Sequence, residues 1–201
     1  MIHKESRRLT QLIDNILDFS RIEAGRREYR FQRADVARVV EEVLDAYRFQ
    51  LEQQGFTLVV DLQDDVPPLE VDQEALGQAL LNIVNNAVKY SAGDKHIEVR
   101  LRREAERVTV AVADHGIGIH KSEQAKVFEK FYRSGDSLVH ETHGSGLGLA
   151  LVRHIMEAHG GSVELQSMSG QGSTFTLVLP LERSGLRRRR TASARPQGNE
   201  A

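Results

Sequence analysis

The 201-residue sequence contains no cysteine, which excludes disulfide bonds and thiol catalysis and is compatible with a reducing compartment. It has no apolar run that approaches the roughly 18 residues needed to span a bilayer. Its first residues, MIHKESRRLT, lack the apolar core of a signal peptide. Neither sign of charge dominates, since 27 lysines and arginines stand against 29 aspartates and glutamates. We therefore expect a soluble, cytoplasmic chain with no general attraction to nucleic acid or to anionic membranes.

The first 27 residues have the pattern of a single helix. Ile2, Leu9 and Ile16 are seven residues apart, and Leu12 and Phe19 repeat that spacing, which gives a narrow apolar a/d seam. The seam leaves two interpretations open: a helix that caps its own domain, or one helix of a bundle that another chain completes. We favour the bundle because polar residues flank the seam on both sides.

Helical and strand patterns are mixed along the rest of the chain. The strands expected at 96–104 and 107–116 form a hairpin, and those at 162–167 and 172–180 end the ordered part. This order favours an α+β fold, a two-layer α/β sandwich, over a doubly wound sheet. Residues 183–201 are basic, small and polar, and we expect a disordered tail. The other expected elements are helices at 36–54, 73–91 and 146–159, a strand at 56–62, a proline-rich loop at 64–72, and Asp72 as the N-cap of the helix after it.

The helix at 73–91 carries a polar stripe. Asn82, Asn86 and Lys89 are four and three residues apart, so they share one face. An amide oxygen is a neutral, hard ligand that suits Mg²⁺, and a nearby lysine suits the phosphates that such a metal bridges. Asparagine on a helix can also be merely exposed or capping. That interpretation is weakened because the surrounding stretch, LLNIVNNAVKY, is otherwise apolar.

A second polar feature follows the strand VAVAD. Asp114 ends this strand and is followed by Gly116 and Gly118. A partly buried carboxylate can accept a hydrogen bond from an exocyclic amine such as that of adenine, and the glycines would let the backbone close over the base. An aspartate-initiated turn explains the same residues equally well.

The segment KVFEKFYRS interrupts a long polar region. Phe128 and Phe131 are three residues apart on a helical turn, and we expect them to anchor this segment, with Arg133 placed for a phosphate. Two core aromatics and a surface arginine are an equally good explanation of each residue taken alone.

Gly144, Gly146 and Gly148 alternate and run into the start of the last expected helix. The free amides and positive dipole end of a helix N-terminus attract phosphate. No G-x-x-x-x-G-K-[ST] string occurs, and the glycine spacing does not match the dinucleotide fingerprint. The DHG at 114–116 lacks the H-R-D catalytic loop of eukaryotic-type kinases.

In this order, the blocks resemble the ATP-binding domain of two-component sensor histidine kinases. NIVNNAVKYS resembles the N box of the family, DHGIGI its first glycine box, FEKFYR its F box and GSGLGLA its second glycine box, and GQGSTFTLVLP is similar to its closing strand. The resemblance covers about residues 30–180. It implies the Bergerat α/β sandwich with an ATP lid between Gly118 and Gly144. The opening helix, with LIDNILDFSRIEAG, resembles the second helix of the dimerisation and phosphoacceptor domain of the family.

The resemblance also implies residue roles. Asn86 would coordinate Mg²⁺ with help from Asn82, Lys89 and Arg133 would contact the phosphates of ATP, and Asp114 would read the adenine amino group. Tyr90 would line the pocket, and the glycines would shape the pocket and lid. The other residues implied at the nucleotide are Gly116, Gly118, Ile119, Gly144, Ser145, Gly146, Leu147, Gly148 and Thr174.

One position discriminates within the wider superfamily. Gyrase-type and mismatch-repair ATPases and anti-sigma serine kinases carry a glutamate four residues before the metal-binding asparagine, and it activates a water or a hydroxyl. Here that position is Asn82, whose amide cannot serve as a general base. Phosphoryl transfer to a histidine fits best, because a neutral imidazole is already nucleophilic.

The phosphoacceptor motif of the family, H-E-x-x-[TN]-P, does not occur. The pair His140 and His143 lacks the further ligands that zinc needs. The eight histidines are His3, His96, His115, His120, His140, His143, His154 and His159, and none has the expected context. No catalytic residue is therefore assigned, and we expect either the C-terminal part of a longer kinase or a chain that acts on a partner.

The expected organisation has three parts: residues 1–27 as a partial dimerisation domain, 28–182 as the ATP-binding catalytic domain and 183–201 as the tail. The expected partners are a phosphoacceptor histidine domain, the receiver domain of a response regulator and, through the first helix, a second copy of the full-length kinase. A membrane anchor elsewhere in the full-length kinase is compatible with this expectation. The alternative is a nucleotide-binding regulatory or interaction module without kinase activity of its own.

Overall fold

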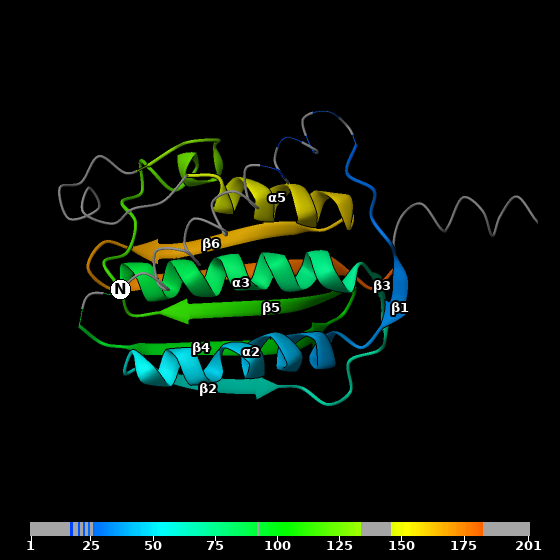
Figure 1. Cartoon of the computed structure of the whole chain (residues 1–201), viewed down its shortest axis with the longest axis horizontal. Helices are drawn as coiled ribbons and strands as arrows, with labels where there is room; N and C mark the ends of the chain where they lie inside the picture. The colour runs from blue at the N-terminus through cyan, green and yellow to red at the C-terminus, as the bar shows by residue number, and fades with distance from the viewer. Residues whose placement is uncertain are drawn as a thin grey trace, which may run out of the picture.

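The computed structural model describes residues 26–91, 93–133 and 146–182, together with Leu17, Ser20, Ile22 and Ala24. A five-stranded sheet has the order β2-β4-β5-β7-β6, and three helices lie side by side over one of its faces (Figure 1). This arrangement confirms the expected two-layer α/β sandwich. The helices are α2 (Val36–Gln53), α3 (Gln73–Tyr90) and α5 (Gly148–Ala158), with a 3₁₀ turn η1 (Lys126–Phe128), and the strands of this sheet are β2 (Thr57–Leu62), β4 (His96–Glu104), β5 (Arg107–Asp114), β6 (Ser162–Met168) and β7 (Gly172–Pro180).

The core lies between the sheet and the helices. Strand β5 is central and pairs antiparallel with both β4 and β7, while β2 joins β4 in parallel. Alternation along β5 directs Val108, Val110 and Val112 into the core, where each is almost fully buried. Leu80 and Ile83 of α3 are buried in the same core. The sheet therefore fixes the position of α3, which carries the polar stripe.

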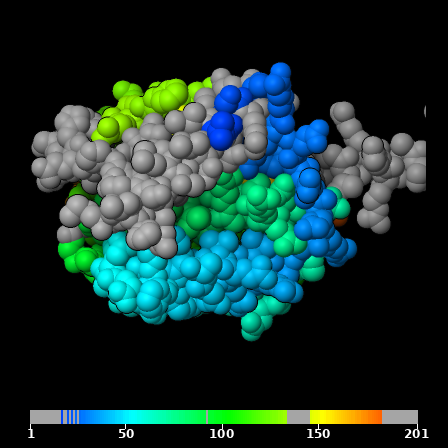
Figure 2. Space-filling view, in the orientation of Figure 1, coloured from blue at the N-terminus to red at the C-terminus, as the bar shows by residue number. Residues whose placement is uncertain are grey.

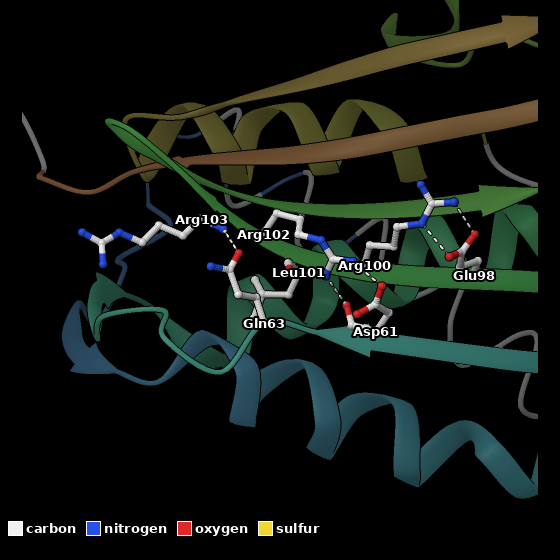
Figure 3. A network of polar contacts seen from close by, with 7 residues as sticks. All are labelled: Asp61, Gln63, Glu98, Arg100, Leu101, Arg102 and Arg103. Carbon is white, nitrogen blue, oxygen red and sulfur yellow. Dashed lines mark hydrogen bonds and ion pairs between the residues drawn. The ribbon is translucent and has the colours of Figure 1, made fainter.

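The opposite face of the sheet is polar. On β4, Arg100 pairs with Glu98 and Arg102 pairs with Asp61 of β2, while the backbone N–H of Arg103 donates to Gln63 Oε1 over 2.9 Å (Figure 3). Glu98, Arg100 and Arg102 alternate with the buried side chains of β4, so they point away from the helices. Water screens such exposed pairs, which therefore add little to stability.

Side-chain caps explain where two of the helices begin. Asp35 accepts hydrogen bonds from the backbone N–H groups of Ala37 and Arg38 at the start of α2, and Asp72 accepts one from Ala75 at the start of α3. The predicted cap at Asp72 is confirmed. The last helix begins at Gly148, two residues later than predicted, because the left-handed backbone of Gly146 (φ 69°) cannot continue a helix.

A second sheet was not predicted. Leu69–Val71 (β3), which the sequence placed in a proline-rich loop, pairs antiparallel with Gln32–Ala34 (β1). Leu69 and Val71 are buried and Glu70 is exposed, so the alternation of a strand is present, but the partner lies far away in the sequence. Pairing with β1 decided the structure of this segment.

Among the described residues, no helix is both long enough and apolar enough to cross a membrane. Most of the predicted helix 1–27 and the whole predicted tail 183–201 fall outside the described residues. The division into three parts remains a prediction.

Candidate functional site

The middle of α3 meets the start of α5. Asn82 is buried, with 8% of its surface exposed, and its Nδ2 donates to the backbone oxygen of Gln78 over 2.9 Å. A Cβ added at Gly148 would lie 3.0 Å from Asn82 Oδ1. A side chain at position 148 would press on this amide, so glycine gives α5 the closest approach to α3. Asn86 is half-buried one turn further along α3. The structure therefore brings the predicted amide stripe to the N-terminus of α5.

Lys89 does not extend freely from the stripe. Its Nζ donates to Tyr90 Oη over 2.8 Å and lies 4.5 Å from the centre of the Tyr90 ring, a cation–π distance. The backbone oxygen of Tyr90 accepts from the N–H of Ile117 over 3.1 Å. The end of α3 is thereby joined to the turn that follows Asp114.

Asp114 is the last residue of β5, and only 7% of its surface is exposed. Its Oδ1 accepts from the backbone N–H of Gly116 over 2.8 Å. Burial raises the pKa of the Asp114 carboxyl, while hydrogen bonds from the backbone of Gly116 and Ser173 partly oppose that rise. A carboxylate offers about four acceptor sites, so these two backbone bonds leave acceptor capacity for a ligand.

Two glycines after Asp114 are required by close backbone contacts. A Cβ at Gly116 would lie 2.3 Å from the backbone oxygen of Tyr90. Gly118 has a φ of 66°, and its Cβ would lie 2.0 Å from the backbone oxygen of Met168. No side chain fits at either position without moving the backbone. The sequence predicted both glycines as part of the pocket, and the structure gives the steric reason.

Several residues that the sequence analysis missed support this turn. Ser167 Oγ accepts from the N–H of Ile119 over 2.8 Å, and Gln124 Nε2 donates to the backbone oxygens of Ile119 and Ser167 over 3.0 and 2.9 Å. A Cβ at Gly172, whose φ is 97°, would lie 2.0 Å from the backbone oxygen of Asp114. The only signal in the sequence was the GQGST string, in which Gly172 is the second glycine.

Thr174 is not brought to the other predicted residues. In the β5–β7 register, Asp114 is opposite Ser173, whereas Thr174 is opposite Ala113. Because side chains alternate along a strand, Thr174 lies on the sheet face away from the helices, and the buried Ser173 lies beside Asp114. Ser173 is therefore the β7 hydroxyl that belongs to this site.

The F-box segment divides into a buried and an exposed aromatic. Phe128 is 9% exposed and packs edge-on against Phe175 of β7, with ring centres 6.2 Å apart. Phe131 is 66% exposed and has a φ of 60°, and its N–H donates to the backbone oxygen of Gly146 over 3.1 Å. Phe128 thus anchors the segment through its side chain, whereas the role of the exposed Phe131 side chain stays a prediction. Arg133 is exposed.

The start of α5 borders the same region. Gly146 approaches the F-box segment, since its Cβ would lie 2.8 Å from the carbonyl carbon of Phe131. Leu147 is buried, so its side chain belongs to the core and only its backbone faces a ligand. Gly144 and Ser145 lie outside the described residues.

The described residues thus form a site where α3, the end of β5 and the start of α5 meet. It combines neutral amide oxygens, a buried carboxylate and the backbone N–H groups of a helix N-terminus. Amides and helix N-termini suit a metal-bound polyphosphate, and the carboxylate suits an amine. This donor set fits a purine nucleoside triphosphate.

Comparison with known proteins agrees with this geometry. The chain is 37% identical to the circadian input-output histidine kinase CikA of Synechococcus elongatus over 89% of its own length and 24% of that protein. It is 34% identical to the sensor-like histidine kinase SenX3 of Mycolicibacterium smegmatis over 88% of its length and 46% of that protein. The crystal structure of full-length ShkA in complex with AMPPNP superposes with a TM-score of 0.76 at 28% identity, over 90% of this chain and 37% of that one.

The chain therefore spans between about a quarter and a half of the length of these relatives. Residues 71–183, more than half of the chain, match the family described as histidine kinase-, DNA gyrase B- and HSP90-like ATPases. The match begins at the last residue of β3 and includes every residue of the site described above. The chain belongs to this ATPase family, and along most of its length it is similar to part of the sequence of sensor histidine kinases.

Proposed function

We propose that this chain transfers the γ-phosphate of Mg-ATP to a histidine that it does not itself carry, for onward transfer to the aspartate of a response regulator. In this reaction an imidazole nitrogen bonds to the γ-phosphorus as the bond to the bridging oxygen breaks, and ADP leaves. Positioning and charge stabilisation are the main contributions of a protein to such a transfer. The role of the chain is then to hold ATP so that the γ-phosphate faces the acceptor.

The observation that carries this proposal is the amide at position 82. Asn82 is buried, donates to its own helix and contacts the start of α5. It stands where the hydrolytic members of the superfamily are expected to have a glutamate. An amide takes no proton from water, so this position supports holding ATP but not hydrolysing it. A histidine acceptor needs no such base, because its neutral ring is nucleophilic.

The proposed roles follow the placement of the residues. Asn86, with Asn82, would hold Mg²⁺ through amide oxygens, and the metal when bound would offset charge on the phosphates. Lys89 would leave Tyr90 to reach a phosphate, and Arg133 would approach from the other side. The backbone N–H groups at the start of α5 would bind phosphate oxygens. Gly148 supports this fit, because the space that a Cβ would fill lies against Asn82 Oδ1.

Partners follow from the same proposal. Residues 1–27 would be the second helix of a dimerisation and phosphoacceptor domain, and two copies of the full-length kinase would pair through it. The apolar seam of Ile2, Leu9 and Ile16 supports this, because a narrow a/d seam is buried only against other helices. The phosphoacceptor domain and the receiver domain of the regulator would be the two protein substrates.

Adding an acceptor in trans tests the proposal. The chain is incubated with γ-labelled ATP, Mg²⁺ and a separate histidine-bearing helical domain, with a histidine-to-glutamine variant of that domain as the control. We expect acid-labile label on the acceptor histidine, none on the glutamine control and none on this chain alone. ATP binding without transfer would contradict kinase activity and would favour a nucleotide-dependent interaction module. Acid-labile label on the isolated chain would refute the absence of self-phosphorylation.

A further inference from the structure

His159 is a buried polar side chain that the proposed chemistry does not use. It follows the last residue of α5, and only 1% of its surface is exposed. Its Nδ1 lies 2.7 Å from the backbone oxygen of Ile155, and its Nε2 lies 3.1 Å from the backbone nitrogen of Asp72. A carbonyl oxygen only accepts, so Nδ1 carries the proton and Nε2 accepts from the N–H of Asp72. The neutral ring therefore satisfies both bonds.

The bond to Asp72 connects the end of α5 to the start of α3. Asp72 is the N-cap of α3, where its Oδ1 accepts from the N–H of Ala75 over 3.0 Å. Its Oδ2 accepts from the N–H of Arg30 over 2.8 Å. One aspartate thus joins α3, α5 through His159, and the segment that leads into β1. Any shift of His159 along the axis of α5 would break its hydrogen bond to this group.

The two helices contact each other at two distant points. His159, at the end of α5, meets Asp72 at the start of α3, and Gly148, at the start of α5, meets Asn82 in the middle of α3. The helices therefore run antiparallel between these contacts. At 1.5 Å per residue, the stretch from Asp72 to Asn82 rises about 15 Å and the stretch from Gly148 to His159 about 16 Å. The spans match, so fixing one contact fixes the other.

The segment before β1 packs on the same ring. Phe31 and Tyr29 meet the His159 ring edge-on, with ring centres 5.0 and 6.0 Å away. The guanidinium of Arg27 lies 5.2 Å from the centre of Tyr29, and its Nη2 donates to Gln78 Oε1 of α3 over 2.6 Å. In the space-filling view, this blue segment lies beside the start of the green helix α3 (Figure 2). The chain entering the domain therefore touches the group that joins the two helices.

We propose that His159 is a positioning residue that sets the register of α5 against α3. It thereby sets the height of the turn at Gly146 and Gly148 above Asn82 and Asn86. Through Tyr29 and Phe31, that register also depends on the segment that leads in from the N-terminal helix. This inference rests on the proposed function for its effect on phosphoryl transfer. A slip of one residue moves α5 by about 1.5 Å, and a misplacement of about 1 Å lowers a transfer rate by about a hundredfold.

Three variants of the full chain separate positioning from packing. H159F keeps an aromatic ring against Phe31 but loses both hydrogen bonds. H159Q places an amide oxygen near the position of Nε2, within reach of the N–H of Asp72. H154F is the control, because His154 is half-buried on the same helix with its ring 6.3 Å from Tyr29. Each variant is compared with the wild type by amide NMR shifts, by AMPPNP affinity and by unfolding temperature.

In H159F we expect the backbone N–H of Gly148 and the side-chain amide of Asn82 to change resonance without nucleotide. AMPPNP affinity should fall several-fold and phosphoryl transfer in trans about tenfold to a hundredfold. In H159Q and in H154F, the resonances, the AMPPNP affinity and the rate of phosphoryl transfer should all stay close to those of the wild type. A folded H159F with wild-type resonances and affinity would overturn the inference, even if its unfolding temperature were lower.

A milder pair of variants decides the matter if H159F does not fold. H159N retains a donor for Ile155 but is too short to reach Asp72, whereas H159Q reaches it, so H159N alone should show the changed resonances. Equal behaviour of the two would overturn the inference. Absence of transfer in the wild type would refute the proposed function, and the NMR shifts would still decide the role of His159.

Discussion

Replacing Asp114 by asparagine keeps the size of the side chain and removes one of its acceptor oxygens. In the wild type, the carboxylate accepts from the backbone N–H of Gly116, through Oδ1 over 2.8 Å, and from the backbone of Ser173, and its remaining lone pairs are left for a ligand. The single oxygen of asparagine would stay on these backbone N–H groups, because an unsatisfied buried N–H costs about 1–3 kcal/mol. Its NH₂ group would then face the pocket and oppose the amino group of adenine, since both are donors.

The size of the effect follows from the lost bond. A hydrogen bond to a charged group contributes about 1.5–3 kcal/mol, and about 1.4 kcal/mol corresponds to a tenfold change in affinity. ATP affinity should therefore fall about 10- to 150-fold. GTP presents an acceptor oxygen where ATP presents the amine, so the new NH₂ group should bind it better than the carboxylate does. The preference for ATP over GTP should shrink or reverse.

The D114N substitution should lower ATP affinity but should not lower the stability of the nucleotide-free protein. Burial raises the folded-state pKa of Asp114 above the reference value of 3.8. The contribution of this group to stability is therefore complete below the unfolded-state pKa and is lost as the pH rises through the folded-state pKa. At pH 7 the ionised carboxylate costs stability, so D114N without nucleotide should unfold at the same or a higher temperature than the wild type. The difference should narrow as the pH falls toward 3.8.

Titration calorimetry with ATP and GTP, and thermal unfolding from pH 7 downward, measure these effects. The control is D94N, the same chemical change at an exposed aspartate that pairs with His115 over 2.7 Å. It should leave nucleotide affinity unchanged. Unchanged ATP affinity and ATP-to-GTP ratio in D114N would refute the assignment of Asp114 to the base.

The remaining predictions concern the metal, the approach of α5 and the F-box segment. N86A should lose the Mg²⁺-dependent part of ATP binding, measured by calorimetry with and without the metal. The control N85A changes a side chain that bonds to α2 and should lower only the unfolding temperature. Equal Mg²⁺ dependence of ATP binding in both variants would contradict the metal assignment. G148A should weaken ATP binding several-fold in the same assay, because its Cβ would lie 3.0 Å from the amide oxygen of the stripe; wild-type affinity would show that this close approach is not needed. F128A should lower the free energy of unfolding, measured in urea, by about 3 kcal/mol or more. F131A, at an exposed ring, should change it by less than about 0.5 kcal/mol. Similar losses of unfolding free energy in the two variants would contradict the packing described.

Much of the site could be predicted because its signals are local. The spacing of Asn82 and Asn86 places both on one helix face whatever surrounds them. The glycines after Asp114 were predicted from sequence, and the structure shows the carbonyls that exclude a Cβ there. The errors arose where a distant partner decided the outcome. Thr174 was predicted at the nucleotide, whereas the β7–β5 register, which cannot be read from β7 alone, places Ser173 beside Asp114.

The sequence by itself determined the α/β pattern, the caps, and the amides and carboxylate that suit a nucleotide, because helix period, strand alternation and capping depend on residues a few positions apart. Tertiary structure decided which groups meet. It paired β1 with β3, placed Ser173 beside Asp114 and joined the end of α5 to the start of α3 through His159. The period of a segment shows which of its faces is buried. The atom that each buried polar group meets depends on how segments far apart in the sequence pack together.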